Sequence, residues 1–235
     1  MNIADIERYV VEEVGVAVNR EWGNYCDIPP EYVNVCNGAD MQQRVSEIAG
    51  CISWFIDKQK NGEKLDNYLE VGTCAGGVTK AFNHYLNFKS IVLVDDAGAS
   101  NKAFFVDKHS NWKRSEVLGF LKRIEIIGNS NDIKTITAAK NLGIEFDILF
   151  IDAGHEYIEV KRDTVYYSQL VREGGYVIFH DSIGCPGVSL WLEELEAQWG
   201  KISRLNRQIE FAFSGKYTLE WPEGMGLRIY RKEVI

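Results

Sequence analysis

The sequence predicts a doubly wound, Rossmann-like α/β fold with a helical cap at its N-terminus. Residues 91–94 and 147–151 are near-continuous apolar runs, as expected for parallel strands that are covered on both faces. From residue 65 onward, helical and strand patterns alternate, which is typical of a parallel sheet with crossover helices. A glycine-rich turn, residues 72–77, follows the first predicted strand and precedes a helical pattern. Together these observations predict an open sheet with a ligand site at its strand ends.

Two helices are expected before the sheet begins. The first covers residues 1–20, where apolar residues recur near helical spacing at Ile3, Ile6, Val10, Val14 and Val18. Asp40 is expected to cap the second helix, and Asn61-Gly62 is expected to end it.

The predicted core then alternates between strands and helices. The expected strands cover residues 67–71, 90–94, 123–127, 146–151 and 174–180. The expected helices cover residues 78–86, 112–121, 132–141 and 157–171. A helix near residues 188–199 and two hairpin-like strands, near residues 207–213 and 226–231, would complete a seven-stranded sheet.

Length and composition indicate one globular domain. A chain of 235 residues can bury a full core, and its 46% hydrophobic and 26% charged residues are ordinary values. We expect residues 1–60 to form the helical cap or lid, and residues 61–235 to form the core of one structural domain overall.

Charge and cysteine content restrict the partners and the compartment. The formal net charge of -8 disfavours nucleic acid as a partner, because an acidic chain repels phosphate backbones. The five cysteines form no C-x-x-C pair, which favours reduced thiols in a cytoplasmic protein. The N-terminus is acidic, unlike a signal peptide, and no apolar run approaches the roughly 20 residues of a membrane span. No membrane partner is expected, and a homo-oligomer stays open.

The glycine-rich turn carries the first family resemblance. Glu70-x-Gly72-x-x-x-Gly76 resembles motif I of the class I S-adenosylmethionine (SAM)-dependent methyltransferases. The dinucleotide pattern G-x-G-x-x-G is not met, because Cys74 occupies the position of its middle glycine. The resemblance implies that SAM is the cofactor. The residues expected to hold its amino-acid portion are Glu70, Gly72, Thr73, Gly76 and Gly77.

The exits of the second and third strands predict contacts to the nucleoside. Asp95 lies about 20 residues past the glycine turn, where an acid can bind ribose hydroxyls; the alternative is a solvated loop acid. The third exit, Gly-x-Ser130-Asn131-Asp, looks like the G-x-S-Q-D of catechol-type O-methyltransferases. That resemblance implies that Ser130 and Asn131 meet the adenine ring, and capping of the next helix is the alternative.

The exits of the fourth and fifth strands predict a metal site. Asp152 and Asp181 would face one another, which is costly without a cation or proton between them, and such oxygens suit Mg²⁺. Both acids match the metal ligands of metal-dependent catechol-type O-methyltransferases, but Ser182 stands where that family has asparagine. Sugar and macrolide O-methyltransferases have an acidic pair here, and His180 would be its first member. The third ligand, His180 or Ser182, stays open, as does a metal-free site.

His155 is the expected general base. It lies three residues after Asp152, where the catechol-type enzymes carry a lysine that deprotonates the substrate. Histidine is the usual general base near neutral pH. The alternative is that His155 caps or packs beneath the following helix. Asp152 is assigned to the cofactor, the metal and the reaction together.

The resemblance implies a SAM-dependent O-methyltransferase for a small hydroxylated acceptor, either a sugar or a secondary metabolite. Mg²⁺ is expected to assist if the metal site is filled. One alternative is a SAM-binding partner module without catalysis. A second is an NAD-dependent oxidoreductase that uses Asp95 for the ribose.

Overall fold

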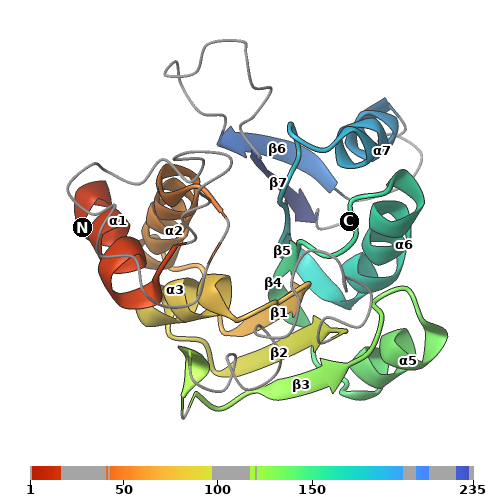
Figure 1. Ribbon diagram of the computed structural model, residues 1–235, viewed down its shortest axis with the longest axis horizontal. Helices are drawn as coiled ribbons and strands as arrows, with labels where there is room; N and C mark the ends of the chain where they lie inside the picture. Colours follow the sequence, from red (N-terminus) through yellow and green to blue (C-terminus); the bar gives the residue numbers. More distant parts are fainter. Residues whose placement is uncertain are drawn as a thin grey trace. The chain divides into compact units, whose positions relative to one another are not determined.

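The computed structural model describes residues 2–16, 41, 43–96, 117–119, 121–197, 205–211 and 226–232 (Figure 1). The chain divides into two compact units. The helical unit comprises Met1–Lys64, Thr73–Asn87 and Ala97–Lys122. The sheet unit comprises Leu65–Gly72, Phe88–Asp96 and Arg123–Ile235. The expected division at residue 60 stays a prediction.

The first helix of the helical unit is shorter than predicted. Helix α1 (Ile3–Tyr9) begins after Asn2, whose side chain accepts a hydrogen bond from the Ala4 amide. It passes into a π-helical turn, η1 (Val10–Val14), which ends at Gly15. The prediction of a helix through residue 20 is wrong, because Gly15 adopts φ 90° and Val16 already pairs with Met41 in a β-bridge.

Helices α2 (Val45–Lys60) and α3 (Gly77–Leu86) also belong to this unit. Helix α2 ends at Asn61-Gly62 as predicted, with Gly62 at φ +89°. The proposed cap Asp40 and most of the predicted helix 112–121 lie outside the described residues. The Phe55 and Phe82 rings lie 6.2 Å apart and join α2 to α3.

The sheet unit contains one mixed sheet, so the predicted α/β class is confirmed. Its strands are β1 (Asn67–Val71), β2 (Ser90–Asp95), β3 (Ile124–Ile127), β4 (Phe146–Ile151), β5 (Val171–Phe179), β6 (Leu205–Phe211) and β7 (Leu227–Lys232). The described strands lie in the order β3-β2-β1-β4-β5-β7-β6. The pairs among β1 to β5 are parallel, whereas β7 is antiparallel to β5 and β6.

The junction between the helix that follows β4 and strand β5 differs from the prediction. Helix α6 (Tyr157–Tyr167) ends four residues before the predicted end at residue 171, and a 3₁₀ turn, η3 (Ser168–Leu170), follows it. Strand β5 begins at Val171, which is buried and pairs with Phe146 of β4. Sheet pairing therefore overrides the helical pattern here. Gly174-Gly175 lies inside the strand, near a register shift, and not at its start.

Three helices cover one face of the sheet: α5 (Ile133–Asn141), α6, and α7 (Pro186–Ala197) (Figure 1). Their buried residues pack with alternate residues of the central strands, as the two-residue period of a strand requires. The Trp191 indole of α7 donates a 2.8 Å hydrogen bond to the Thr164 hydroxyl of α6 and joins these two helices.

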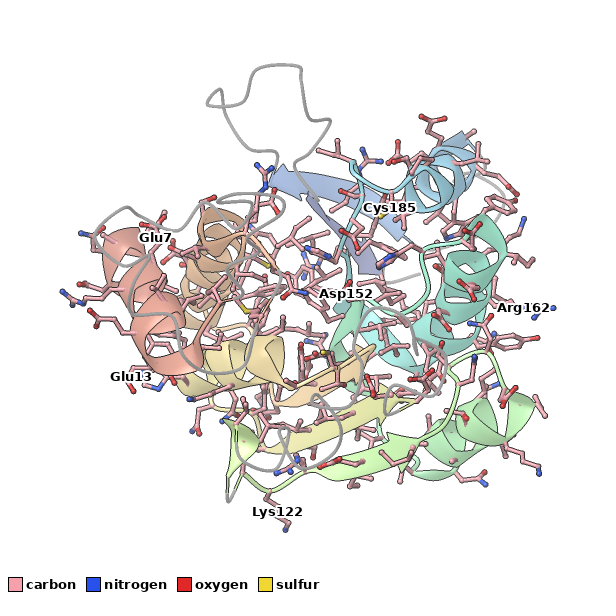
Figure 2. All side chains as sticks on the ribbon, viewed as in Figure 1. Glu7, Glu13, Lys122, Asp152, Arg162 and Cys185 are labelled. Atoms are coloured by element: carbon pink, nitrogen blue, oxygen red, sulfur yellow. The ribbon has the colours of Figure 1, made fainter. Side chains whose placement is uncertain are left out.

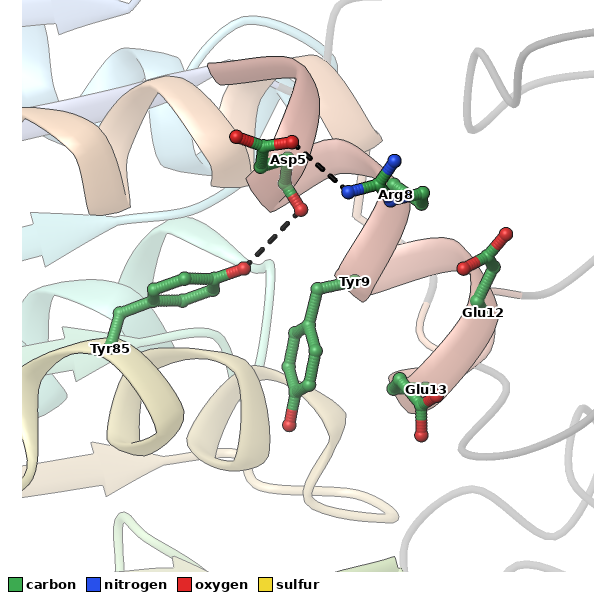
Figure 3. Close-up of a pocket in the computed structure, with 6 residues that line it drawn as sticks. All are labelled: Asp5, Arg8, Tyr9, Glu12, Glu13 and Tyr85. Carbon is green, nitrogen blue, oxygen red and sulfur yellow. Dashed lines mark hydrogen bonds and ion pairs between the residues drawn. The ribbon is translucent and has the colours of Figure 1, made fainter. Parts of the chain in front are cut away.

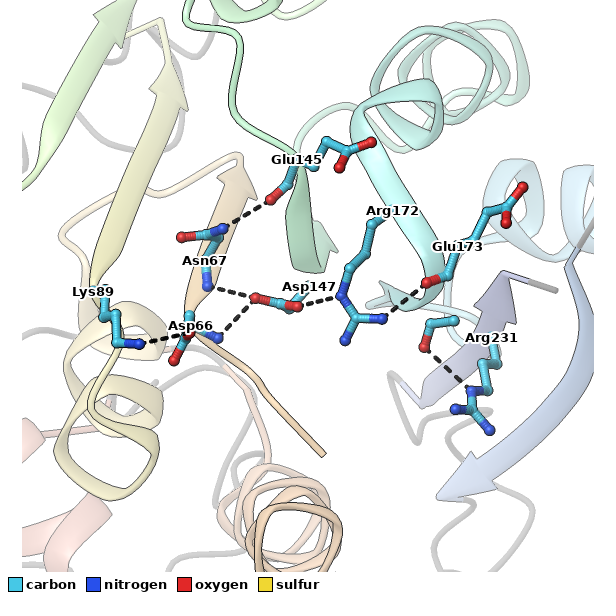
Figure 4. Close-up of polar contacts among 9 residues, drawn as sticks. Asp66, Asn67, Lys89, Glu145, Asp147, Arg172, Glu173 and Arg231 are labelled. Carbon is cyan, nitrogen blue, oxygen red and sulfur yellow. Dashed lines mark hydrogen bonds and ion pairs between the residues drawn. The ribbon is translucent and has the colours of Figure 1, made fainter. Parts of the chain in front are cut away.

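A polar network joins the strands at the edge where β1 and β4 begin (Figure 4). The Asp147 carboxylate is buried and accepts hydrogen bonds from the Asp66 and Asn67 amides, at 2.7 and 2.8 Å. Its other oxygen accepts from Arg172 of β5. One side chain therefore connects three neighbouring strands, at the edge opposite the strand exits.

Candidate active site

The register of the parallel strands aligns their carboxyl ends. Val71 of β1 pairs with Val94 of β2 and with Ile151 of β4. Ile151 in turn pairs with Phe179 of β5. The residues that follow these four therefore leave the sheet along one edge, which is where open α/β sheets bind ligands.

Gly72 brings the first and fourth strand exits into contact. It adopts φ +90°, and a Cβ at this position would lie 2.1 Å from the Asp152 carbonyl oxygen. The Gly72 amide donates to the Val94 carbonyl at 2.8 Å, and the Asp152 amide donates to Val71 at 2.8 Å. Only glycine fits this close approach.

The other predicted cofactor residues of the sheet unit follow the same edge. Glu70 is buried near the end of β1 and accepts a 2.6 Å hydrogen bond from the Tyr68 hydroxyl. Asp95 ends β2 with a half-buried side chain, and its carbonyl accepts from Gly128 at 3.0 Å. Their proposed contacts to SAM stay predictions.

The remaining glycine-turn residues belong to the helical unit. Gly76, at φ +87°, precedes the first residue of α3, Gly77, and its amide donates to the Thr73 carbonyl at 2.9 Å. Cys74 adopts φ 49° although it is not a glycine. The Thr73 hydroxyl is buried and has no hydrogen-bond partner within the described chain.

The loop after β3 is bound by Asp163 of α6, a residue that the sequence analysis did not name. Ser130 and Asn131 donate hydrogen bonds to the two carboxylate oxygens of Asp163 on α6, each at 3.1 Å. Tyr167, one turn further along α6, donates to the Ser130 carbonyl at 3.0 Å. The side-chain oxygen of Asn131 is buried and has no hydrogen-bond partner among the described residues, and its proposed contact to adenine stays a prediction.

The pKa of Asp163 is raised to about 7, mainly by burial; the hydrogen bond from Ser130 opposes this rise, and the nearby Glu159 carboxylate adds to it. A periodicity argument could have found Asp163 only as a charged residue on the inner face of α6. Its partners lie in the loop before α5, which is distant in sequence.

Two acids and two histidines meet at the ends of β4 and β5. The His180 Nδ1 atom lies 3.1 Å from Asp152 Oδ1 and 3.1 Å from Asp181 Oδ1. The His155 Nε2 atom lies 2.7 Å from Asp181 Oδ2 and 3.7 Å from Asp152 Oδ1. We call these four residues the Asp-His cluster. The sequence predicted that Asp152, Asp181 and His155 would converge, and it named His180 as one of two candidate ligands.

The electrostatics of the cluster follow from its alternating charges. Burial lowers the pKa of His155, but its bonds to Asp152 and Asp181 outweigh burial and hold that pKa well above the ordinary value. The pKa of His180 is likewise raised, because both carboxylates outweigh its burial. Burial raises the pKa of each acid, but the histidines outweigh it, so the pKa of Asp152 and that of Asp181 are lowered.

Two buried polar atoms of this region, His180 Nε2 and Ser182 Oγ, have no hydrogen-bond partner within the described chain, and Asp181 Oδ1 forms no hydrogen bond there although it lies 3.1 Å from His180 Nδ1. The ligand atoms of Asp152, His180 and Asp181 lie within 4.8 Å of one another, as do those of His155, Asp181 and Cys185. The two carboxylates therefore fit a divalent cation. The Ser182 hydroxyl instead lies against Gly226, the residue before β7, where an added Cβ would be 2.7 Å from it.

The loop that carries His155 packs closely against the start of α7. A Cβ on Gly187 would lie 2.3 Å from the His155 carbonyl oxygen. Glu156, and not His155, is the N-cap of α6, where it forms a capping box with Glu159. The predicted alternative of a capping role for His155 is therefore wrong. Asp152, at the exit of β4, and Cys185, directly before α7, are labelled in Figure 2.

A surface pocket of about 360 Å³ lies elsewhere, on the helical unit (Figure 3). Its lining residues are Asp5, Arg8, Tyr9, Glu12, Glu13 and Tyr85. Arg8 pairs with Asp5 at 3.0 Å, and both side chains are more than half exposed. None of the predicted site residues lines this pocket.

Among the described helices, none is long and apolar enough to cross a membrane.

Comparisons with known proteins agree with this fold. Residues 69–182 match the family model of a methyltransferase domain, a stretch that runs from β1 to the exit of β5. Uncharacterized protein R132 of Acanthamoeba polyphaga mimivirus is 30% identical over 123 residues, which are 51% of this chain and 53% of that protein. The chain thus spans about half the length of the curated relative that it matches.

Solved structures with a similar fold include three methyltransferases. MycE from the mycinamycin biosynthetic pathway, in complex with Mg, SAH and mycinamycin VI, has a TM-score of 0.53 at 18% identity, covering 79% of this chain and 49% of MycE. CalS11, a TDP-rhamnose 3'-O-methyltransferase in calicheamicin biosynthesis, has a TM-score of 0.54 at 12% identity, covering 80% of both chains. The O-methyltransferase TomG from Streptomyces achromogenes, in complex with SAM, has a TM-score of 0.54 at 14% identity, covering 79% of this chain and 81% of TomG.

Proposed function

We propose that this chain, which resembles the class I SAM-dependent methyltransferases, transfers the methyl group of SAM to a hydroxyl of a small molecule. The methyltransferase-domain match over residues 69–182 supports SAM as the donor. Two similar structures support a sugar or secondary metabolite as the acceptor, since CalS11 is a TDP-rhamnose methyltransferase and MycE was solved with mycinamycin VI. The observation that carries the proposal is the Asp-His cluster at the strand exits of this domain.

The reaction needs an acceptor oxygen that has lost its proton. That oxygen attacks the methyl carbon of SAM in line, a C–O bond forms as the C–S bond breaks, and S-adenosylhomocysteine (SAH) leaves. The ring of His155 is half exposed, so an acceptor can reach it. Its Nε2 atom faces Asp181 at 2.7 Å and so carries a hydrogen, which makes Nδ1, the other ring nitrogen, the proposed proton acceptor. Alignment of the two substrates supplies most of the acceleration, because the sulfonium is already an activated donor.

His155 can accept this proton only when it is neutral. The carboxylates of Asp152 and Asp181 raise its pKa and so favour the imidazolium form. A divalent cation at these carboxylates, Mg²⁺ in the sequence prediction, would offset their charge and make the acceptor hydroxyl more acidic. The roles of the chain itself are to hold Asp181 beside His155 and to orient the ring.

Ligand binding tests the cofactor. We expect SAM and SAH to raise the melting temperature of the full chain, and NAD to leave it unchanged. A thermal-shift panel of the three compounds, with and without Mg²⁺, measures this. Stabilisation by NAD alone would support the oxidoreductase alternative. SAM binding without turnover in a screen of sugar and secondary-metabolite hydroxyls would support the non-catalytic module.

The His155→Ala variant tests the proposed base. We expect turnover to fall by about 10²-fold or more, the usual contribution of a general base, while the Kd for SAM stays nearly unchanged. The matched control is His84→Ala, because His84 stacks on Tyr9 in the helical unit, outside the Asp-His cluster. Equal turnover in wild type and the His155 variant would remove His155 from the mechanism.

A further inference from the structure

We propose that the Asp-His cluster binds a first-row transition-metal dication in preference to Mg²⁺, with Asp152, His180 and Asp181 as its ligands. This inference rests on the proposed function only in that it concerns the same site. It differs from the sequence prediction of Mg²⁺ in the identity of the ion, and it chooses His180 from the two third ligands, His180 and Ser182, that the sequence left open.

The spacing of the three donor atoms suits a bound ion. His180 Nδ1 lies 3.1 Å from Asp152 Oδ1 and 3.1 Å from Asp181 Oδ1. Adjacent ligands of an octahedral ion with bonds of about 2.1 Å lie about 3.0 Å apart. The cluster therefore already has the spacing of neighbouring ligands. An imidazolium shared by the two carboxylates would have the same spacing, so the experiment below must separate the two states.

One oxygen of Asp181 is incompletely satisfied. Asp181 is 2% exposed, and its Oδ1 atom lies 3.1 Å from His180 Nδ1 without the geometry of a hydrogen bond within the described chain. Leaving a buried carboxylate oxygen without a well-formed hydrogen bond is costly, and a cation is one way to satisfy it. The second oxygen of Asp181 faces His155 at 2.7 Å, in the manner of the outer hydrogen bonds that orient metal-binding carboxylates.

The structure favours His180 over Ser182 as the third ligand. The Ser182 hydroxyl lies against Gly226, directly before β7, whereas the Nδ1 atom of His180 lies 3.1 Å from both acids. The His180 amide donates to the Ile151 carbonyl at 3.1 Å, which fixes its backbone beside β4.

A mixed nitrogen and oxygen donor set changes the preferred ion. Mg²⁺ prefers oxygen ligands and keeps several waters, whereas imidazole suits Fe²⁺, Co²⁺, Ni²⁺ and Zn²⁺.

Metal titration of the full-length, metal-stripped chain tests the proposal. Co²⁺ is the probe, because its visible absorption reports nitrogen ligation, and calorimetry gives the Kd of Co²⁺ and of Mg²⁺. We expect wild type to bind one Co²⁺ more than about tenfold tighter than Mg²⁺. In His180→Asp the three donors become oxygens, so the ratio of the two Kd values should fall by about tenfold or more, and the nitrogen-dependent absorption should change.

The outcomes separate the inference from the proposed function. Failure of Co²⁺ to bind, equal affinities in wild type, or an unchanged ratio in the variant would overturn the inference, and the first result would favour the shared imidazolium. The neutral variant His180→Asn, which should weaken Co²⁺ binding without an added charge, serves if His180→Asp does not fold. SAM binding is measured in parallel without metal, so its loss would contradict the proposed function and leave the metal result standing.

Discussion

At the scale of single residues, Asp163 is a residue of the candidate site that the sequence alone did not identify. The sequence predicted Ser130 and Asn131 at the third strand exit, but it gave no sign of the acid to which both donate. Strand exits can be predicted because parallel strands end at one edge of the sheet. Which side chain of α6 meets a given loop depends on the rotation of that helix, which a single sequence does not specify.

The buried carboxyl of Asp163 predicts a pH-dependent stability. Its pKa rises from 3.8 to about 7 on folding, so the folded state keeps a proton that the unfolded state releases. Its contribution to stability is complete below about pH 4 and is lost as the pH rises through 7. Relative to Asp163→Asn, wild type should therefore lose free energy of unfolding between about pH 4 and pH 7, by about 1.4 kcal/mol per pH unit at most, and change little above that range. Urea unfolding of both proteins across this range measures it. A pH-independent difference would contradict the assignment.

Gly72 predicts a severe steric effect. In Gly72→Ala the new methyl group would overlap the Asp152 carbonyl, at 2.1 Å, in addition to the strain at φ +90°. We expect a loss of more than about 3 kcal/mol in stability, beyond ordinary overpacking. Gly62→Ala is a matched control, because Gly62 has φ +89° and no atom within 4 Å of the new Cβ. It should lose only the conformational term of about 1–2 kcal/mol. Similar urea midpoints for the two variants would show that the contact with Asp152 relaxes easily.

At the scale of elements, the sequence predicts the central strands well and their junctions less well. The apolar runs of β2 and β4 identify strands because both faces are buried. The predicted helix 157–171 was too long because Val171 is apolar and continues the periodicity of α6, yet it pairs with Phe146. The predicted N-terminal helix was too long for a similar reason, since apolar spacing does not reveal the turn at Gly15.

The polar network around Asp147, where β1 and β4 begin, predicts how much free energy of unfolding is lost when the contacts among β1, β4 and β5 are broken (Figure 4). Asp147→Asn replaces one acceptor oxygen with a donor, although three donors face this side chain. We expect a loss of about 3 kcal/mol, the range for breaking a buried ion pair. Asp66→Asn should cost less than about 1 kcal/mol, because Asp66 pairs with Lys89, whose side chain is 74% exposed. Equal urea midpoints for these two variants would show that the network contributes little.

At the scale of the sheet unit as a whole, burial predicts the order of local opening. Every residue of β4 is buried, whereas the end strand β3 has partly exposed residues throughout. We expect amide hydrogens of β1 and β4 to exchange slowest and those of β3 to exchange faster. Hydrogen-exchange mass spectrometry with peptide resolution measures this order. Faster exchange in β4 than in β3 would show that burial within the sheet does not determine local stability.

Asp181 adopts φ 57°, a conformation that most residue types reach only with strain. Glycine tolerates it best, asparagine and aspartate tolerate it next best, and β-branched residues tolerate it least. The backbone that aims this carboxylate therefore also narrows the substitutions available to evolution. Where Asp181 is replaced during evolution, asparagine and glycine should be the most frequent substitutes, because they keep this turn folded.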